Sequence, residues 1–114
     1  MAGSDPTSAM APGTIVVDGA LAYRDALIER AFEFRDTPCV GRTHGIHAEP
    51  TSFGLRLAGF AFEADRNLNR LRAAFEQAAV GKLSGAVGTY ASLPPKVEAA
   101  VMERLGIRAE DAST

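Results

Sequence analysis

The sequence predicts an all-α fold, a helical bundle fragment in which one long central helix is flanked by two shorter helices. Apolar residues recur at the three- and four-residue spacing of a helix along three segments of the chain. The central pattern, over about residues 51–80, is much longer than the other two. No run of alternating apolar and polar residues indicates a strand.

The first helix is expected over about residues 19–35. Its apolar side chains form a broad stripe that contains Leu21, Tyr23, Leu27, Ile28, Ala31, Phe32 and Phe34. A stripe of this breadth is typical of a helix that is covered on more than one side. Pro38 follows the pattern and ends the helix, since the residue before a proline is driven out of the helical region.

The second helix is expected to begin near Pro50 or Thr51, because a proline in the first turn costs no hydrogen bond. Its apolar positions are separated by three or four residues throughout: Phe53, Leu57, Phe60, Ala64, Leu68, Leu71, Phe75 and Ala78. A helix that ends near Val80 is roughly 45 Å long at about 1.5 Å per residue. Two shorter helices cannot cover both of its flanks, so we expect it to pack against other chains or further segments.

The third helix is expected to follow Pro94 and Pro95, with Val97, Val101 and Leu105 on its apolar stripe and Gly106 as its stop. The helical segment as a whole then covers residues 19–107. The small and polar residues 1–18 are expected to be a disordered leader or a cloning remnant, and residues 108–114 a flexible tail.

Composition narrows the class of protein. Apolar residues make up 46% of the 114 residues and charged residues 23%, which is ordinary for a globular chain. The net charge of −2 gives no electrostatic reason to bind nucleic acid. The sequence shows neither a membrane span nor a signal peptide, and its single cysteine, Cys39, fits a reducing compartment. We therefore expect a cytoplasmic protein with no nucleic-acid or membrane partner.

The candidate functional residues gather between the first two helical patterns. Residues 41–54 read GRTHGIHAEPTSFG and contain both histidines of the chain, His44 and His47. Loops carried by rigid helices are frequent sites of chemistry, and a histidine can exchange a proton near neutral pH. A second block, GKLSGAVGTY over residues 81–90, is rich in glycine and carries Lys82. Such a block can present backbone N–H groups to an anion, although its spacing is not that of a phosphate loop.

Both blocks, in this order and with a long helix between them, resemble conserved segments of the adenylosuccinate lyases in the fumarase/aspartase superfamily. The resemblance covers about residues 25–107. It implies a helical fold and a β-elimination that releases fumarate from adenylosuccinate, and from the related succinyl-carboxamide ribotide of purine synthesis. It also implies a cytoplasmic homotetramer without a metal or other cofactor.

The resemblance assigns roles to four residues. His44 matches the general acid that protonates the departing nitrogen. Thr43 matches a position beside the substrate, and Lys82 and Ser84 match the glycine-rich segment near the assembled site, so all three are candidate substrate-binding residues. The serine loop of the family, typified by Ser-Ser-x-Met-Pro-x-Lys-x-Asn, and an earlier functional histidine do not occur in these 114 residues. We therefore interpret the chain as a central fragment that is inactive by itself.

Other interpretations stay open at this point. Arg42 could contact a substrate, but pairing with Glu49 to brace the loop is the favoured role. His44, His47 and Glu49 could in principle bind zinc, although no further cysteine or histidine completes such a site. Cys39 is expected to serve packing alone. The main alternative function is a non-catalytic helical module that associates with itself or with a full-length lyase.

Overall fold

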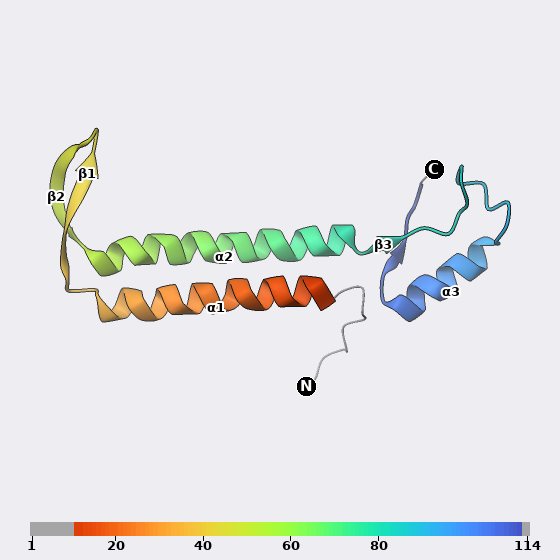
Figure 1. The fold of residues 1–114 in the computed structure, drawn as a ribbon, viewed down its shortest axis with the longest axis horizontal. Coiled ribbons are helices and arrows are strands. Elements are labelled where there is room, and N and C mark those ends of the chain that lie inside the picture. The colour runs from red at the N-terminus through yellow and green to blue at the C-terminus, as the bar shows by residue number, and fades with distance from the viewer. Residues whose placement is uncertain (1–10, 113–114) are drawn as a thin grey trace. The chain divides into compact units, whose positions relative to one another are not determined.

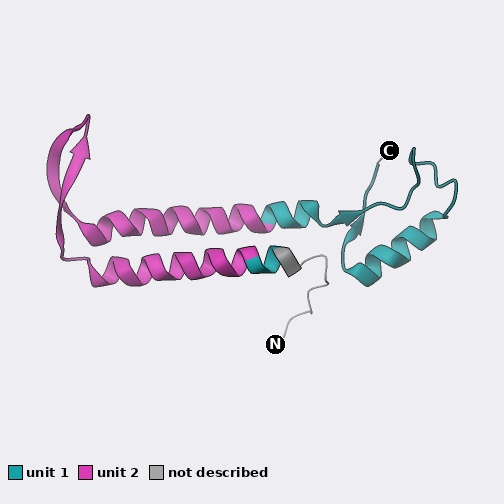
Figure 2. Ribbon diagram, in the orientation of Figure 1, with its two compact units in different colours: residues 1–15, 73–114 teal, residues 16–72 magenta. Residues whose placement is uncertain are grey.

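The computed structural model describes residues 11–112, which form the helices α1 (Ala11–Glu33), α2 (Phe53–Ala78) and α3 (Pro95–Leu105) and four short strands (Figure 1). The strands are β1 (Pro38–Thr43), β2 (Ile46–Ser52), β3 (Val80–Gly81) and β4 (Arg108–Ala109). The chain divides into two compact units, which Figure 2 distinguishes by colour. The larger unit, residues 16–72, holds the hairpin and most of α1 and α2, and the smaller unit holds residues 11–15 and 73–112.

In the larger unit, α1 and α2 lie side by side and are tied together where the hairpin joins them (Figure 1). The backbone N–H of Phe53 donates to the Thr37 carbonyl at 2.8 Å, and that of Gly54 donates to the Phe34 carbonyl at 2.9 Å. The rings of Phe34 and Phe53 pack with their centroids 5.3 Å apart. Gly54 permits this approach, since a Cβ atom there would lie 2.3 Å from the Ala31 carbonyl oxygen.

The buried face of α2 is made largely of small residues. Gly54, Ala61, Ala64 and Leu68 are buried, and Leu68 is fully inaccessible to solvent. An ion pair between Arg24 and Asp65, 3.0 Å apart, adds a polar contact between α1 and α2. Several members of the stripe predicted from the sequence are covered less well, since Phe53 and Phe60 remain exposed. The helical period was therefore predicted correctly, and Ala64 and Leu68 of the predicted stripe are buried, whereas earlier in the helix Gly54 and Ala61 are buried in place of Phe53 and Phe60.

The expectation that every regular element is helical was wrong for residues 38–52. This segment forms an antiparallel hairpin in which Pro38 lies opposite Ser52 and Thr43 opposite Ile46. Most of its side chains are exposed, so neither face of the hairpin needs to be apolar and no alternation marks it in the sequence. The helical fold class itself is confirmed, with this small two-stranded sheet added to it.

The helix boundaries also differ from those expected. Helix α1 begins at Ala11, so residues 11–18 are helical rather than part of a disordered leader, and residues 1–10 lie outside the described part of the chain. Helix α2 begins at Phe53, because the Ser52 hydroxyl caps it by accepting the Leu55 N–H at 3.0 Å.

The smaller unit is built around α3 and a short parallel pairing of β3 with β4. Helix α3 starts at Pro95 and is capped by Gly106 in the left-handed conformation, with φ of 68°, as the sequence predicted. The Arg108 N–H donates to the Ala79 carbonyl at 3.0 Å, and the Glu110 N–H donates to the Gly81 carbonyl at 2.9 Å. Residues 108–109 are therefore a strand instead of the start of a flexible tail.

Candidate functional site

The hairpin of the larger unit carries His44 at its tip. His44 and Gly45 form the two-residue turn between β1 and β2, with φ of 50° and 73°. Positive φ at both central positions is the signature of a type I′ turn, whose twist matches that of the two strands. The side chains of Thr43 and His44 are exposed, so the structure brings these two candidate residues together on an accessible surface.

The other polar residues of the hairpin flank this turn without forming a cluster. Arg42 lies opposite His47 in the strand register, and none of the ion pairs among the described residues joins it to Glu49. Within residues 11–112, no three His, Cys, Asp or Glu side chains gather closely enough to hold a metal ion. The zinc hypothesis for His44, His47 and Glu49 thus has no geometric support in this region.

The second pair of candidate residues lies in the smaller unit, in the glycine-rich segment that follows β3. Lys82 is half-buried, and Ser84 is buried with 5% of its surface exposed. The Ser84 Oγ has no hydrogen-bond partner among the described residues. The Ser84 carbonyl, in contrast, accepts the Tyr90 N–H at 2.8 Å, which closes residues 84–90 into a loop.

Glu98, on α3, is a buried residue that the sequence analysis did not single out. Only 3% of its surface is exposed. One carboxylate oxygen accepts the Leu83 N–H at 2.6 Å, and the other accepts the Tyr90 hydroxyl at 2.8 Å. The hydrogen bond to Glu98, together with burial and the nearby negative charge, raises the pKa of Tyr90. A glutamate beside the apolar stripe of a predicted helix gives little signal, because most such residues are solvated.

Residues 41–54 and residues 81–90 each contain one non-glycine residue whose backbone lies in the left-handed φ/ψ region. These residues are His44, with φ of 50°, and Tyr90, with φ of 55°. For a bulky side chain this conformation is uncommon and costs free energy, so the surrounding structure must hold it in place. In the hairpin the strand pairing supplies this constraint, and in the glycine-rich segment the hydrogen bonds to Glu98 and Ser84 supply it.

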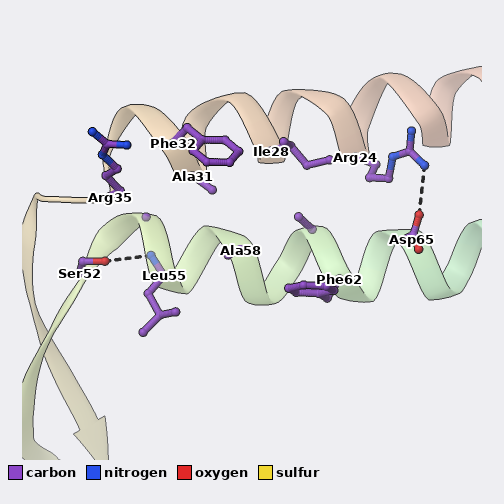
Figure 3. A pocket seen from close by; sticks show the side chains of 12 residues that line it. Arg24, Ile28, Ala31, Phe32, Arg35, Ser52, Leu55, Ala58, Phe62 and Asp65 are labelled. Carbon is purple, nitrogen blue, oxygen red and sulfur yellow. Dashed lines mark hydrogen bonds and ion pairs between the residues drawn. The ribbon is translucent and has the colours of Figure 1, made fainter.

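An apolar groove of about 550 Å³ runs between α1 and α2 in the larger unit. Figure 3 shows that Ile28 and Phe32 line it from α1, and that Leu55 and Phe62 line it from α2. Phe32 is 70% exposed and Phe62 is 69% exposed. The groove is therefore an uncovered apolar surface. A separate property concerns the helices themselves: within residues 11–112, no helix combines the length and the hydropathy that a membrane span requires.

Comparison with known proteins gives this geometry a context. The chain is 47% identical over 102 residues to the adenylosuccinate lyase of Thermotoga maritima. This alignment covers 90% of this chain and 24% of that enzyme. It is 46% identical, over an alignment of 117 positions, to the adenylosuccinate lyase of Bacillus subtilis. This alignment covers 89% of this chain and 27% of that enzyme. The chain thus spans about a quarter of the length of these curated relatives.

Solved structures agree with the sequence comparison. A fumarate lyase from Mesorhizobium sp. BNC1 superposes with a TM-score of 0.83 and 31% identity, over 91% of this chain and 26% of that one. The 3-carboxy-cis,cis-muconate lactonizing enzyme from Pseudomonas putida superposes with a TM-score of 0.78 and 29% identity, over 88% of this chain and 23% of that one. The model of the lyase family matches residues 15–113. The chain therefore belongs to the lyase family.

Proposed function

We propose that this chain supplies part of the active site of an adenylosuccinate lyase of purine biosynthesis, with His44 as the general acid. In this reaction a base removes a proton from the carbon next to a carboxylate of the succinyl group. The C–N bond then breaks, fumarate leaves, and the purine amine takes a proton from the imidazolium of His44. The same chemistry applies to the succinyl-carboxamide ribotide. The observation that carries the proposal is the exposed His44 at a tight two-residue turn in a chain nearly half identical to adenylosuccinate lyases.

The remaining candidate residues would bind the substrate. Thr43 adjoins His44 and offers a hydroxyl that can donate to a carboxylate or phosphate oxygen. Lys82 offers a positive charge for the same groups. Ser84 is less favourably placed, because its hydroxyl is buried and can reach a substrate only if the loop moves.

These 114 residues are expected to have no activity by themselves. They contain two histidines, both in the hairpin, and lack the serine loop that the resemblance assigns to the proton-abstracting base. A proton donor without the matching base loses most of the catalysis, because residues that act as a unit contribute non-additively. We place the assembled enzyme in the cytoplasm.

The test is to replace the matching segment of the Thermotoga maritima enzyme with residues 15–113 and to follow fumarate release from adenylosuccinate. The graft should be active, and His44→Ala should lower kcat by about 10² to 10⁴, the usual contribution of a general acid. His47→Ala is the matched control, since it removes the other exposed histidine of the hairpin and should leave most of the activity. A correctly folded graft that keeps its activity in His44→Ala contradicts the proposal.

A second candidate function, a helical module that assembles with itself, is favoured by a different observation. The groove between α1 and α2 exposes Ile28, Phe32, Leu55 and Phe62 together. A contiguous exposed apolar patch is typical of a protein interaction site. A homotetramer built on these helices would cover it.

Light scattering on the purified chain tests this second function. The wild-type chain should have the mass of an oligomer, and Phe62→Asn should lower that mass by weakening the apolar contact. Glu63→Gln, one residue further along α2, is the control and should leave the mass unchanged. A wild-type chain that is strictly monomeric and well folded rules the module out.

A further inference from the structure

Glu98 has an unusual environment for a charged side chain. It is 97% buried, since 3% of its surface is exposed, and none of the ion pairs among the described residues involves it. A carboxylate removed from water in this way is costly unless hydrogen bonds replace its hydration. Both of its oxygens are used, one by the Leu83 N–H and the other by the Tyr90 hydroxyl.

These two donors lie near the two ends of the glycine-rich segment. Leu83 directly follows Lys82, and Tyr90 ends the motif. Between them, the Tyr90 N–H donates to the Ser84 carbonyl at 2.8 Å and the Gly88 N–H donates to the Gly85 carbonyl at 3.4 Å. The carboxylate therefore holds both ends of one short loop from a single point on α3.

We propose that Glu98 is a positioning residue, which fixes residues 82–90 through Leu83 and Tyr90 and so holds Lys82 in one orientation toward an anionic substrate. The part of this proposal that concerns substrate rests on the proposed function above. The part that concerns the loop does not, because it follows from the contacts of Glu98 alone.

A carboxylate suits this role better than a neutral side chain. Hydrogen bonds to an ionised acceptor are shorter and about twice as strong as neutral ones. A glutamine has one acceptor oxygen, so it can accept from either Leu83 or Tyr90 with that atom but not from both in the same way. Its NH₂ group can donate to the Tyr90 hydroxyl oxygen, but neither bond then has an ionised acceptor, so the hold on the loop weakens.

The hydrogen bond from Tyr90 to Glu98 also helps to keep the Tyr90 backbone in its left-handed conformation. The residue has φ of 55°, and within residues 11–112 its side chain makes one hydrogen bond, which its hydroxyl donates to Glu98. Loss of this anchor should let Tyr90 relax toward an ordinary backbone conformation. The loop between Ser84 and Tyr90 would then open.

The first test uses the phenol of Tyr90 as a reporter. The chain has two tyrosines, so Tyr23→Phe leaves Tyr90 as the only one, and its ionisation is followed by ultraviolet absorbance. Because Glu98 raises the pKa of Tyr90, Glu98→Gln should lower that pKa. Glu103→Gln removes an exposed charge from the same helix and should leave the Tyr90 pKa unchanged. Equal titrations in all three proteins overturn the proposed contact.

The second test measures amide hydrogen exchange at Leu83 in the full chain. Loss of a charge-assisted hydrogen bond should accelerate exchange about tenfold or more in Glu98→Gln. Tyr90→Phe keeps the carboxylate, so the Leu83 amide should stay protected while the far end of the loop exchanges faster. Unchanged protection of the Leu83 amide in a normally folded Glu98→Gln variant contradicts the proposal that Glu98 holds the loop.

The third test separates positioning from simple structural support. In the lyase graft described above, Glu98→Gln should raise the KM for adenylosuccinate about tenfold, equivalent to one lost hydrogen bond to a charged group, and should change kcat much less. Glu98→Asp, which keeps the charge, should recover part of the loss. A fall in kcat and thermal stability with KM unchanged indicates structural support alone and overturns the positioning role. An inactive wild-type graft refutes the proposed function, whereas titration and exchange still decide whether Glu98 holds the loop.

Discussion

The hairpin turn of the larger unit and the glycine-rich loop of the smaller unit hold their candidate residues by different means. His44 stands exposed on a turn that is defined by backbone pairing and by positive φ at two successive residues. The loop after β3 is instead held by a buried carboxylate that bonds it at two points. Accessibility suits a proton donor, whereas a fixed frame suits a group that must meet a substrate in one orientation.

The same contrast extends to how each unit is stabilised. The larger unit buries few large side chains, and the buried residues of α2 are Gly54, two alanines and Leu68. The buried residues of the smaller unit include Met102 and two polar residues, Ser84 and Glu98. Substitutions in the larger unit should therefore act through packing, and those in the smaller unit through hydrogen bonds.

The largest effect is expected at Leu68, the fully buried side chain of α2. Leu68→Ala should lower the free energy of unfolding by about 2–5 kcal/mol, because it removes buried methyl groups and leaves a cavity. Leu55→Ala, on the same helix but 65% exposed, should change it by less than about 0.5 kcal/mol. Urea unfolding measures both, and equal losses would show that the exposed face is covered as well, as in an oligomer.

Alanine substitutions at two glycines of α2 should change the free energy of unfolding by smaller amounts and in opposite directions. A Cβ at Gly54 would lie 2.3 Å from the Ala31 carbonyl oxygen and 2.5 Å from the Arg35 Cα, so Gly54→Ala must push α1 and α2 apart. We expect a loss of about 1–3 kcal/mol, as for other overpacked sites. A Cβ at Gly59 has nothing within 4 Å, so Gly59→Ala should stabilise the helix by about 0.5–1 kcal/mol. Thermal unfolding of the two variants distinguishes these outcomes, and similar shifts would contradict the close approach at Gly54.

The smaller unit should lose stability at high pH. The raised pKa of Tyr90 means that the folded state binds its proton more tightly than the unfolded state does. The resulting stabilisation is complete below the unfolded tyrosine pKa of about 10 and is lost as the pH rises through the folded value. Unfolding midpoints between pH 8 and 11 should fall more steeply for the wild-type chain than for Tyr90→Phe, whereas identical slopes would exclude this linkage.

Much of the helical architecture could be predicted from the sequence. The three- and four-residue spacing from Phe53 to Ala78 indicates α2, and Pro95 and Gly106 mark the ends of α3. The start of α1 was missed because the alanine, proline and glycine at its N-terminus resemble a coil by composition. The hairpin was missed because most of its side chains are exposed and no apolar alternation marks it in the sequence.

The candidate site was predicted only in part. The sequence singled out Thr43 and His44, and the structure places Thr43 at the end of β1 and His44 in the adjoining turn, both exposed, while their roles stay predictions. The positive φ of His44 and Tyr90 depends on strand pairing and on distant hydrogen bonds, so it leaves no local signal. Glu98 was overlooked because burial of a glutamate depends on the tertiary partners Leu83 and Tyr90.

The most direct test of the account is His44→Asn, which separates the turn from the chemistry. Asparagine tolerates positive φ and precedes Gly45 as in the favoured Asn-Gly turn, so the hairpin should be as stable as before or more stable. Asparagine cannot donate a proton as an acid, so fumarate release by the lyase graft should fall by about 10² to 10⁴ while its structure is retained. Full activity in a folded His44→Asn graft would show that His44 serves the turn alone.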